Sequence, residues 1–364
     1  VSNNKPGQKV RVTLFADGAE VVSKEVLAAA DLAPQLLLTI PDDKVRLWSI
    51  GDPFLYDLKL ELIDADGNVV DRAASYAGLR GITIDGQKVL LNGKPVFQRL
   101  VLDQGYYADG IMTAPTDDAL KQDIVLSMEA GFNGARLHQK VFEERFLYHA
   151  DQLGYLVWGE FGDWGLDRSN QSATIVAEWL TVLERDYSHP SIIGWCPLNE
   201  TRQDITDQIA PLDDITHAMY LATKAMDTTR PVLDSSGYSH RVRGADIYDC
   251  HDYDQNPDTF RERHAGTPDG IVYVNGKNEE RGTEWSIPYA GQPYFVSEFG
   301  GIKWNPAAAD SKESWGYGNT PKDLDEFYDR FEKLCGVLLD NPGMFAYCYT
   351  QLTDVFQEQN GVLN

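Results

Sequence analysis

Residues 192–200 read Ile192-Ile193-Gly194-Trp195-Cys196-Pro197-Leu198-Asn199-Glu200, an apolar run that ends in two polar residues. A short apolar run of this kind predicts a strand buried on both faces, as in a parallel sheet that is covered by helices. We find eight such runs, which are Phe97–Leu102, Phe132–Leu137, Tyr155–Phe161, Ile192–Leu198, Pro231–Asp234, Ile247–His251, Tyr294–Glu298 and Met344–Thr350.

Amphipathic stretches lie between most of these strands. Thr116-Asp117-Asp118 is typical of a helix start, and the pattern continues through Glu129 and stops near Gly131. The other predicted helices are Glu143–Leu153, Thr174–Tyr187, Asp213–Met226 and Lys322–Leu339. Eight β-then-α units predict an α/β fold, the (β/α)₈ TIM barrel, over residues 85–364. Because the sequence stops shortly after the eighth strand, we expect the eighth helix to be missing.

Residues 1–84 have a different pattern, in which short strands are separated by turns. Val10–Phe15, Leu36–Ile40 and Tyr56–Leu62 are predicted strands, and Asp17-Gly18 is a turn signal. This spacing predicts a small all-β, immunoglobulin-like sandwich, which we expect to be truncated at its N-terminus. A hairpin of residues 82–84 and 88–91 leads into the predicted barrel.

Composition excludes several classes of protein. The net charge of −24 disfavours nucleic acid and anionic membrane surfaces as partners. There is no run of about 18 apolar residues to span a membrane. The first residues, VSNNKPGQKV, lack the apolar core of a signal peptide, which slightly favours a cytoplasmic location. The four cysteines lack zinc or redox spacing and are expected to be small buried side chains.

The active site of a (β/α)₈ barrel lies at the carboxyl ends of its strands. We therefore listed the polar and aromatic residues that end or follow each predicted strand. Glu200 and Glu298 are the predicted catalytic pair, and the predicted substrate-binding residues are Asp103, Arg136, His138, Asp163, Trp164, Asn199, His251, Tyr253, Trp304 and Gln351.

The two glutamates suggest cleavage of glycosidic bonds. That reaction needs one carboxyl group to protonate the leaving oxygen and a second to attack the anomeric carbon or to activate water. Asn199 could donate to a sugar 2-hydroxyl, or it could cap the following loop. Trp164, Tyr253 and Trp304 could stack on sugar faces or pack locally.

Other interpretations of the same residues remain open. A single glutamate at a strand end could form a loop salt bridge, and a decayed barrel could bind carbohydrate without cleaving it. His138, His251 and Asp163 could suggest a metal, but their spacing matches no metal motif, so we predict no metal and no cofactor. The predicted partner is a carbohydrate substrate, and self-association to a homo-oligomer is left open.

Several motifs resemble those of glycoside hydrolase family 2, which contains β-galactosidases, β-glucuronidases and β-mannosidases. The similar stretches are Leu47–Tyr56, Gly78–Arg80 with Leu91–Pro95, Asp123–His138, His189–Glu200, Pro293–Gly300, and Thr350–Asp354 with Gln357–Gly361. The resemblance implies a retaining β-glycosidase, β-galactosidase-like in the first place and otherwise a β-glucuronidase or β-mannosidase. It also implies that Glu200 is the acid/base and Glu298 the nucleophile. The first barrel strand differs, since Phe97–Gln104 lacks the Asn and His usual in family members with β-galactosidase activity.

Overall fold

The computed structural model describes residues 1, 3–28, 33–163, 168–200, 204–205, 211–275, 277–278, 282–305 and 314–363. The chain divides into two compact units. Unit 1 consists of Val1–Arg80 with the short segments Asp151–Gly154 and Ser188–Pro190. Unit 2 consists of Gly81–Ala150, Tyr155–Tyr187 and Ser191–Asn364.

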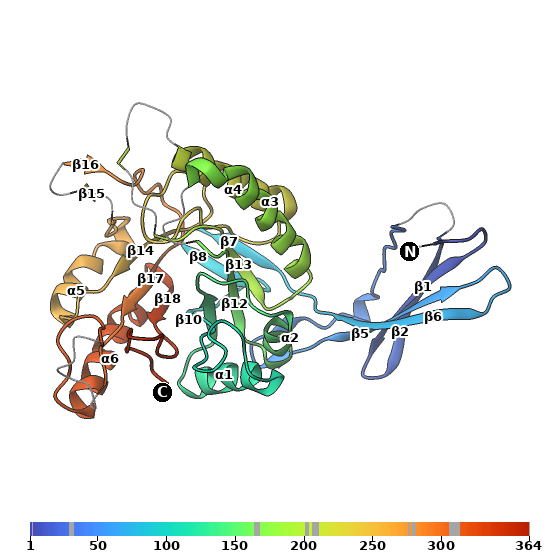
Figure 1. Cartoon of the computed structure of the whole chain (residues 1–364), viewed down its shortest axis with the longest axis horizontal. Helices are drawn as coiled ribbons and strands as arrows, with labels where there is room; N and C mark the ends of the chain where they lie inside the picture. The colour runs from blue at the N-terminus through green and yellow to red at the C-terminus, as the bar shows by residue number, and fades with distance from the viewer. Residues whose placement is uncertain are drawn as a thin grey trace. The chain divides into compact units, whose positions relative to one another are not determined.

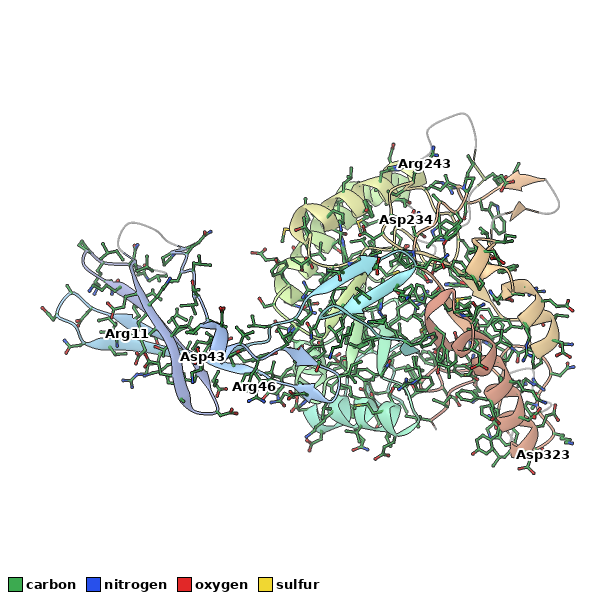
Figure 2. All side chains as sticks on the ribbon, turned by 180° about the vertical axis from the view of Figure 1, so that it is seen from behind. Arg11, Asp43, Arg46, Asp234, Arg243 and Asp323 are labelled. Carbon is green, nitrogen blue, oxygen red and sulfur yellow. The ribbon has the colours of Figure 1, made fainter. Side chains whose placement is uncertain are left out.

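Unit 1 contains a four-stranded antiparallel sheet in the order β2-β1-β5-β6 (Figure 1). Its strands are β1 (Lys9–Ala16), β2 (Ala19–Leu27), β5 (Tyr56–Ile63) and β6 (Val69–Ala77). Opposite charges face each other across these strands, since Arg11 (labelled in Figure 2) pairs with Glu25 on β2 and Glu61 on β5. A short 3₁₀ turn, η1 (Asp42–Lys44), and a two-stranded ribbon of β3 (Trp48–Ser49) and β4 (Asp52–Pro53) complete the unit.

The predicted strand Leu36–Ile40 was wrong, because the described residues there have irregular backbone. Leu38 and Ile40 nevertheless pack against the core of Leu14, Phe54 and Tyr56, which explains the apolar pattern without a strand ladder. The sheet instead uses β2 and β6, whose polar and small residues gave too weak a signal. The immunoglobulin-like sandwich and the boundary at residue 84 stay predictions.

The Leu47–Tyr56 motif supplies two aromatic side chains that hydrogen-bond to the backbone inside unit 1. Trp48 is fully buried, and its indole N–H donates to the carbonyl of Asp151 at 2.7 Å. The Tyr56 hydroxyl donates to the carbonyl of Lys44 and accepts from the backbone N–H of Arg46. Buried indole and phenol groups need such partners, so these residues fix the local chain path.

Unit 2 is built around a curled, seven-stranded parallel sheet, which confirms a mixed α/β fold. The order is β13 (Ile192–Cys196), β12 (Leu156–Glu160), β11 (Gly134–Leu137), β10 (Gln98–Asp103), β18 (Met344–Thr350), β17 (Tyr294–Gly300) and β14 (Tyr248–Asp252). These are seven of the eight predicted strands. The eighth, Pro231–Asp234, makes two parallel bridges, from Val232 to Trp195 of β13 and from Leu233 to Ile247 just before β14.

The helices of unit 2 lie outside its sheet (Figure 1). They are α1 (Asp117–Glu129), α2 (Glu144–Leu153), α3 (Arg168–Asp186), α4 (Pro211–Met226), α5 (Pro257–His264) and α6 (Leu324–Leu339). Thr116 and Asp323 (labelled in Figure 2) cap α1 and α6 by accepting backbone N–H bonds. Five of these helices were predicted. The short α5 was missed, although Asn256-Pro257 is a recognisable helix start.

The small elements of unit 2 include the predicted hairpin. It consists of β7 (Ile82–Asp85) and β8 (Lys88–Leu91), with β9 (Lys94–Pro95) added to β8. The rest are η2 (Thr267–Asp269), β15 (Lys277–Asn278) and β16 (Thr283–Glu284). Among the described residues, none of the helices has both the length and the apolar character needed to cross a membrane.

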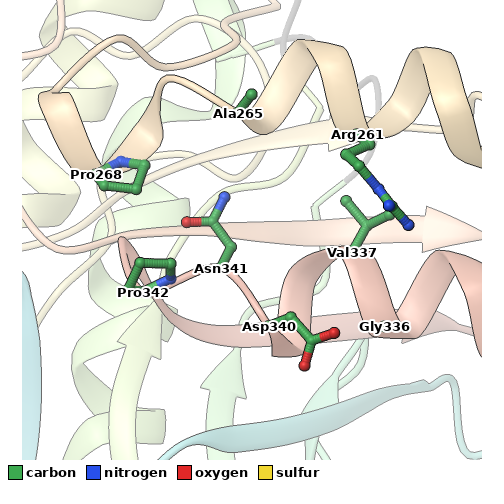
Figure 3. A pocket seen from close by; sticks show the side chains of 8 residues that line it. All are labelled: Arg261, Ala265, Pro268, Gly336, Val337, Asp340, Asn341 and Pro342. Carbon is green, nitrogen blue, oxygen red and sulfur yellow. The ribbon is translucent and has the colours of Figure 1, made fainter.

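A surface hollow of about 280 Å³ lies where α5 and α6 end (Figure 3). It is lined by Arg261, Ala265, Pro268, Gly336, Val337, Asp340, Asn341 and Pro342. Because α6 ends here and β18 begins just beyond, the hollow lies at the amino ends of the strands. In a (β/α)₈ barrel the amino ends of the strands are the side opposite the active site.

Candidate active site

Glu200 and Glu298, the two predicted catalytic residues, lie side by side. Glu298 is inside β17, and Glu200 follows β13 at the far edge of the sheet. A carboxylate oxygen of each and a ring nitrogen of His251 all lie within 4.8 Å of one another. Glu298 is 3% exposed, whereas the Glu200 side chain is 20% exposed. The pair therefore combines one enclosed carboxylate with one that solvent can reach.

Arg136, on β11, is the centre of the buried charge. Its guanidinium donates to Oε1 of Glu298 at 2.6 Å and to Oδ1 of Asn199 at 2.8 Å, and its Nε lies 2.7 Å from Oε2 of Glu160. Burial alone would lower the pKa of Arg136, but Glu160 and Glu298 hold this pKa well above its usual value. Burial raises the pKa of Glu160, yet the charge of Arg136 outweighs it and the pKa is lowered. Arg136 and Glu160 therefore stabilise each other's charged form.

Tyr253 holds the second oxygen of Glu298. Its hydroxyl donates to Oε2 at 2.5 Å and lies 3.1 Å from Oγ1 of Thr350. Its ring stacks on Tyr317, with the ring centroids 3.4 Å apart and the planes at 4°. This stacking covers one ring face, so the position of Tyr253 suits a hydrogen-bond donor to Glu298 better than a platform for a sugar.

His251, on β14, lies between the two glutamates. Its Nδ1 is 2.9 Å from Oε1 of Glu200 and 3.4 Å from Oε2 of Glu298, and its Nε2 is 2.9 Å from Oγ of Ser236. Burial lowers the pKa of His251, but the negative charges of Glu298 and Glu200 outweigh burial and raise it. His251, predicted to bind substrate, thus directly contacts the predicted acid/base.

The backbone at Glu200 is strained. Its φ of 46° lies in the left-handed region that residues with a side chain rarely adopt. The backbone N–H of Glu200 donates to the carbonyl of Ser236 at 3.0 Å, which holds this conformation. Such strain commonly persists where a side chain must be aimed at a functional site.

Three further predicted residues join the same cluster. Nδ1 of His138 lies 2.9 Å from Nη2 of Arg136 and 3.0 Å from Oε1 of Glu160. Asn199 is fully buried, and its Nδ2 has no hydrogen-bond partner among the described residues. Asp163 accepts from the backbone N–H of Asn199 at 3.3 Å. These contacts place His138, Asn199 and Asp163 beside the two glutamates.

The contacts given for the other predicted residues are not with Glu200 or Glu298. Asp103 is buried and accepts from the backbone N–H of Gly105. Gln351 is held between Gln104 and Asn360. The ring of Trp304 lies 5.9 Å from the ring of Phe327. Trp164 lies outside the described residues.

Sequence reasoning missed three polar residues of the cluster, Ser236, Asp249 and Tyr317. Glu160 was recognised as a polar residue at the end of the third predicted strand but was given no role. Asp249 is a fully buried carboxylate on β14, and a buried carboxylate indicates a paired charge. Ser236 and Tyr317 lie in irregular segments whose positions no local pattern predicts.

A metal ion is disfavoured by the charges around the two glutamates. Glu200, His251 and Glu298 are close enough to surround a cation. However, the Arg136 guanidinium already occupies one oxygen of Glu298, and the Tyr253 hydroxyl occupies the other. A fixed cation at 2.6 Å repels a second one. We do not assign these residues as metal ligands, and the absence of a metal stays a prediction.

Residues 1–80 match the family model described as Glycosyl hydrolases family 2. A β-galactosidase of Alteromonas mediterranea is 30% identical over 247 residues, an alignment that covers 63% of this chain and 23% of that protein. The chain thus spans less than a quarter of the length of this curated relative.

Solved structures share the fold at lower identity. A β-glucuronidase from Ruminococcus gnavus, solved in complex with D-glucuronic acid, has a TM-score of 0.73 and 18% identity over 95% of this chain and 56% of that one. A β-glucuronidase from Parabacteroides merdae, solved with glycerol in its active site, has a TM-score of 0.77 and 17% identity over 99% of this chain and 47% of that one. The family model over residues 1–80 and the sequence relatives indicate glycoside hydrolase family 2, and the solved structures show that this chain shares their fold.

Proposed function

We propose that this chain is the catalytic part of a retaining β-glycosidase, with Glu298 as nucleophile and Glu200 as acid/base. The observation that carries the proposal is the approach of the two carboxylates to within 4.8 Å. Retaining enzymes hold their carboxyl groups about 5–5.5 Å apart, whereas inverting enzymes leave about 6.5–9.5 Å for a water molecule. The separation here supports direct attack by a carboxylate.

The surroundings of each glutamate suit its proposed role. Arg136 and Tyr253 both donate to Glu298, so its negative charge is stabilised and one oxygen can be aimed at the anomeric carbon. Glu200 is the more exposed of the two, which suits a group that meets first the leaving group and then water. In the first step Glu200 gives its proton to the leaving oxygen while Glu298 bonds to the anomeric carbon. In the second step water attacks that carbon and returns a proton to Glu200.

Asn199 is proposed to bind the sugar hydroxyl next to the anomeric carbon. Its Oδ1 accepts from Arg136, which fixes the amide and leaves Nδ2 without a partner among the residues that the structure describes. A buried donor without a partner is costly unless a ligand completes its bonding. A sugar hydroxyl would supply that partner.

We propose a β-galactoside rather than a β-glucuronide as substrate. The sequence relatives are named β-galactosidases, whereas the glucuronidases resemble this chain at 17–18% identity, a likeness of fold alone. A glucuronide needs cationic partners for its carboxylate. Glu358 lies within electrostatic range of Glu298, Glu200 and His138. Burial raises its pKa to about 7, so at neutral pH it carries a partial negative charge and offers a uronic acid no cationic partner.

We also propose that unit 2 closes into the full (β/α)₈ barrel. Val232 and Leu233 bridge β13 on one side and the approach to β14 on the other, and these are the two edges of the seven-stranded sheet. A segment paired on both sides leaves no open edge, as in a closed barrel.

The decisive experiment combines trapping with mutation. A 2-deoxy-2-fluoro galactoside with a good leaving group should label the chain with one sugar, and peptide mass spectrometry should find the sugar on Glu298. Glu298→Gln should lower turnover of nitrophenyl β-galactoside by several orders of magnitude. Exposed Glu178→Gln on α3 is the matched control and should change little.

A second experiment tests the acid/base role. Glu200→Ala should slow substrates with poor leaving groups most, and azide should restore part of the turnover because it replaces the attacking water. An equal loss for all leaving groups would count against Glu200. A chain that binds galactosides but cleaves none, in wild type and mutants alike, would instead indicate a carbohydrate-binding protein.

A further inference from the structure

The hydroxyl of Ser236 has more neighbours than it has hydrogens. Its Oγ lies 2.8 Å from Nη1 of Arg136, 2.9 Å from Oδ2 of Asp249 and 2.9 Å from Nε2 of His251. The hydroxyl of Ser297 is 3.2 Å away, but it gives its own hydrogen to Asp249 and so does not donate to Ser236. A serine hydroxyl carries one hydrogen and two acceptor positions. Arginine can only donate, so one acceptor position of Ser236 receives Arg136.

Asp249 takes the single hydrogen of Ser236. Burial raises the pKa of Asp249, but a hydrogen bond from His240 and the charge of that ring outweigh burial and lower it. The charge on His240 persists at neutral pH, because burial lowers its pKa while Asp234 (labelled in Figure 2) and Asp249 raise it to about 10. Asp249 is therefore an anion that can only accept. Two oxygens 2.9 Å apart with no hydrogen between them would repel, so Ser236 donates to Asp249.

Ser236 can then only accept from His251. Its hydrogen is directed to Asp249, and its remaining acceptor position faces Nε2 of His251. Nε2 must accordingly carry a hydrogen, which leaves Nδ1 as the variable position of the ring. Nδ1 lies 2.9 Å from Oε1 of Glu200, and the histidine ring is fully buried. A single proton between Nδ1 of His251 and Oε1 of Glu200 gives both atoms a hydrogen bond.

We propose that Glu200 and His251 share the acid proton of the reaction, with Ser236 and Asp249 fixing His251 as its Nε2–H form. This inference rests on the proposed function and deepens it. In the first step the pair loses its proton to the leaving oxygen as the glycosidic bond breaks. In the second step it regains a proton from the attacking water, so the count balances over one turnover. His251 is thus a proton-holding partner of Glu200 as well as a neighbour of the substrate.

Charged groups face this pair from every neighbouring element. Glu298 on β17 is negative, Asp249 lies on the β14 strand of His251, and Arg136 on β11 is positive. Burial raises the pKa of Glu358 to about 7, so this carboxyl is only partly ionised at neutral pH. The carboxylates raise the pKa of His251, and Arg136 lowers it. The Glu200–His251 pair therefore loses its last proton near the raised pKa of the His251 imidazole. This pKa is higher than that of a carboxyl group.

The first test observes the ring directly and needs no turnover. In the chain labelled with ¹⁵N-histidine, long-range ¹H–¹⁵N spectra between pH 5 and pH 9 should show Nε2 of His251 protonated throughout and Nδ1 titrating. His251→Asn assigns the signals. Glu200→Gln should change the Nδ1 titration, because an amide cannot exchange this proton. An Nε2 without hydrogen, or an Nδ1 titration unaffected by Glu200→Gln, would overturn the proposal.

Two serine variants provide a matched comparison. Ser236→Ala removes the acceptor of Nε2–H, so the Nδ1–H form of the neutral ring should become populated. Ser297→Ala removes the other serine hydroxyl that donates to Asp249 but leaves the contact between Ser236 and His251 in place. The ring should keep its Nε2–H form in Ser297→Ala, and identical spectra for the two variants would contradict the assignment.

The kinetic test uses the pH profile. In His251→Asn the basic limb of kcat/KM for a galactoside with a poor leaving group should move down by about two pH units, the difference between ordinary imidazole and carboxyl pKa values. A dinitrophenyl galactoside, which needs no acid, should keep its profile. A lower rate with an unmoved limb would indicate a purely structural role. A chain that cleaves no glycoside but shows the coupled titration would refute the proposed function alone.

Discussion

Asp103 should make the stability of the folded chain depend on pH. This carboxyl, at the end of β10, is 2% exposed. Burial, together with the charge of Asp123, raises its pKa from 3.8 to about 7, and the hydrogen bond from the backbone N–H of Gly105 offsets only part of this rise. The folded chain therefore keeps the Asp103 proton up to about pH 7, whereas the unfolded chain loses it near pH 4.

The sign of the effect follows from proton binding. A group whose folded pKa is raised binds more protons in the folded state, so the free energy of unfolding falls as pH rises between the two pKa values. Each tenfold change in proton affinity is worth about 1.4 kcal/mol. A rise from 3.8 to about 7 thus corresponds to roughly 4 kcal/mol of stability, present below pH 4 and lost by about pH 7.

Asp103→Asn tests this reasoning, because an amide resembles the protonated acid and can still accept from Gly105. We expect the variant to be more stable than the parent at pH 8, by up to about 4 kcal/mol, and nearly equal to it at pH 4. Urea unfolding followed by tryptophan fluorescence at both pH values measures the difference. The exposed Asp85→Asn is the control and should change little at either pH. A stability difference for Asp103→Asn that is the same at pH 4 and pH 8 would refute the argument.

Three further outcomes are expected. Arg136→Met should destabilise the chain by about 3–5 kcal/mol, because it leaves buried carboxylates without a counter-charge, and adding Glu160→Gln should recover part of the loss in urea unfolding. Tyr253→Phe should lower kcat/KM by about 10- to 100-fold, because a donor to the charged Glu298 is worth about 1.5–3 kcal/mol, and steady-state kinetics would measure the loss. A chelator such as EDTA should leave turnover unchanged, and inactivation that added Mg²⁺ or Zn²⁺ reverses would contradict the assignment of no metal.

The parallel sheet could be predicted from sequence because each of its strands is buried on both faces. Such strands appear as continuous apolar runs, and the positions of seven of them were confirmed. The segment Pro231–Asp234 was predicted as a full strand, but among the described residues it makes only two isolated bridges. Unit 1 was harder still. The apolar pattern of residues 36–40 comes from packing against Tyr56 and Leu14 rather than from a ladder.

The same contrast applies to the site. Glu200 and Glu298 could be predicted as a pair because a glutamate at the end of an apolar strand is conspicuous, and strand ends are where a barrel places its chemistry. Their catalytic role stays a prediction, and the structure shows only that they lie close together. The proximity of Ser236 to His251 could not be found, because it depends on a turn between two distant strands. Asn199 was predicted as a donor to sugar. The structure adds that Arg136 fixes the orientation of its amide.

The electrostatics of the two glutamates also support a proton shared by Glu200 and His251. This reason does not depend on the hydrogen bonds of Ser236. Oxygens of Glu200 and Glu298 lie within 4.8 Å of each other in a largely buried site. Two carboxylates this close disfavour simultaneous ionisation, so one proton is retained near them. Glu298 is the poorer place for that proton, because Arg136 and Tyr253 both donate to its oxygens. The proton therefore stays on the Glu200 side, where His251 is the base within hydrogen-bond distance. Neutralising Arg136 should shift the proton toward Glu298 and abolish its nucleophilicity, so Arg136→Met should prevent labelling by the fluorosugar even where folding is preserved.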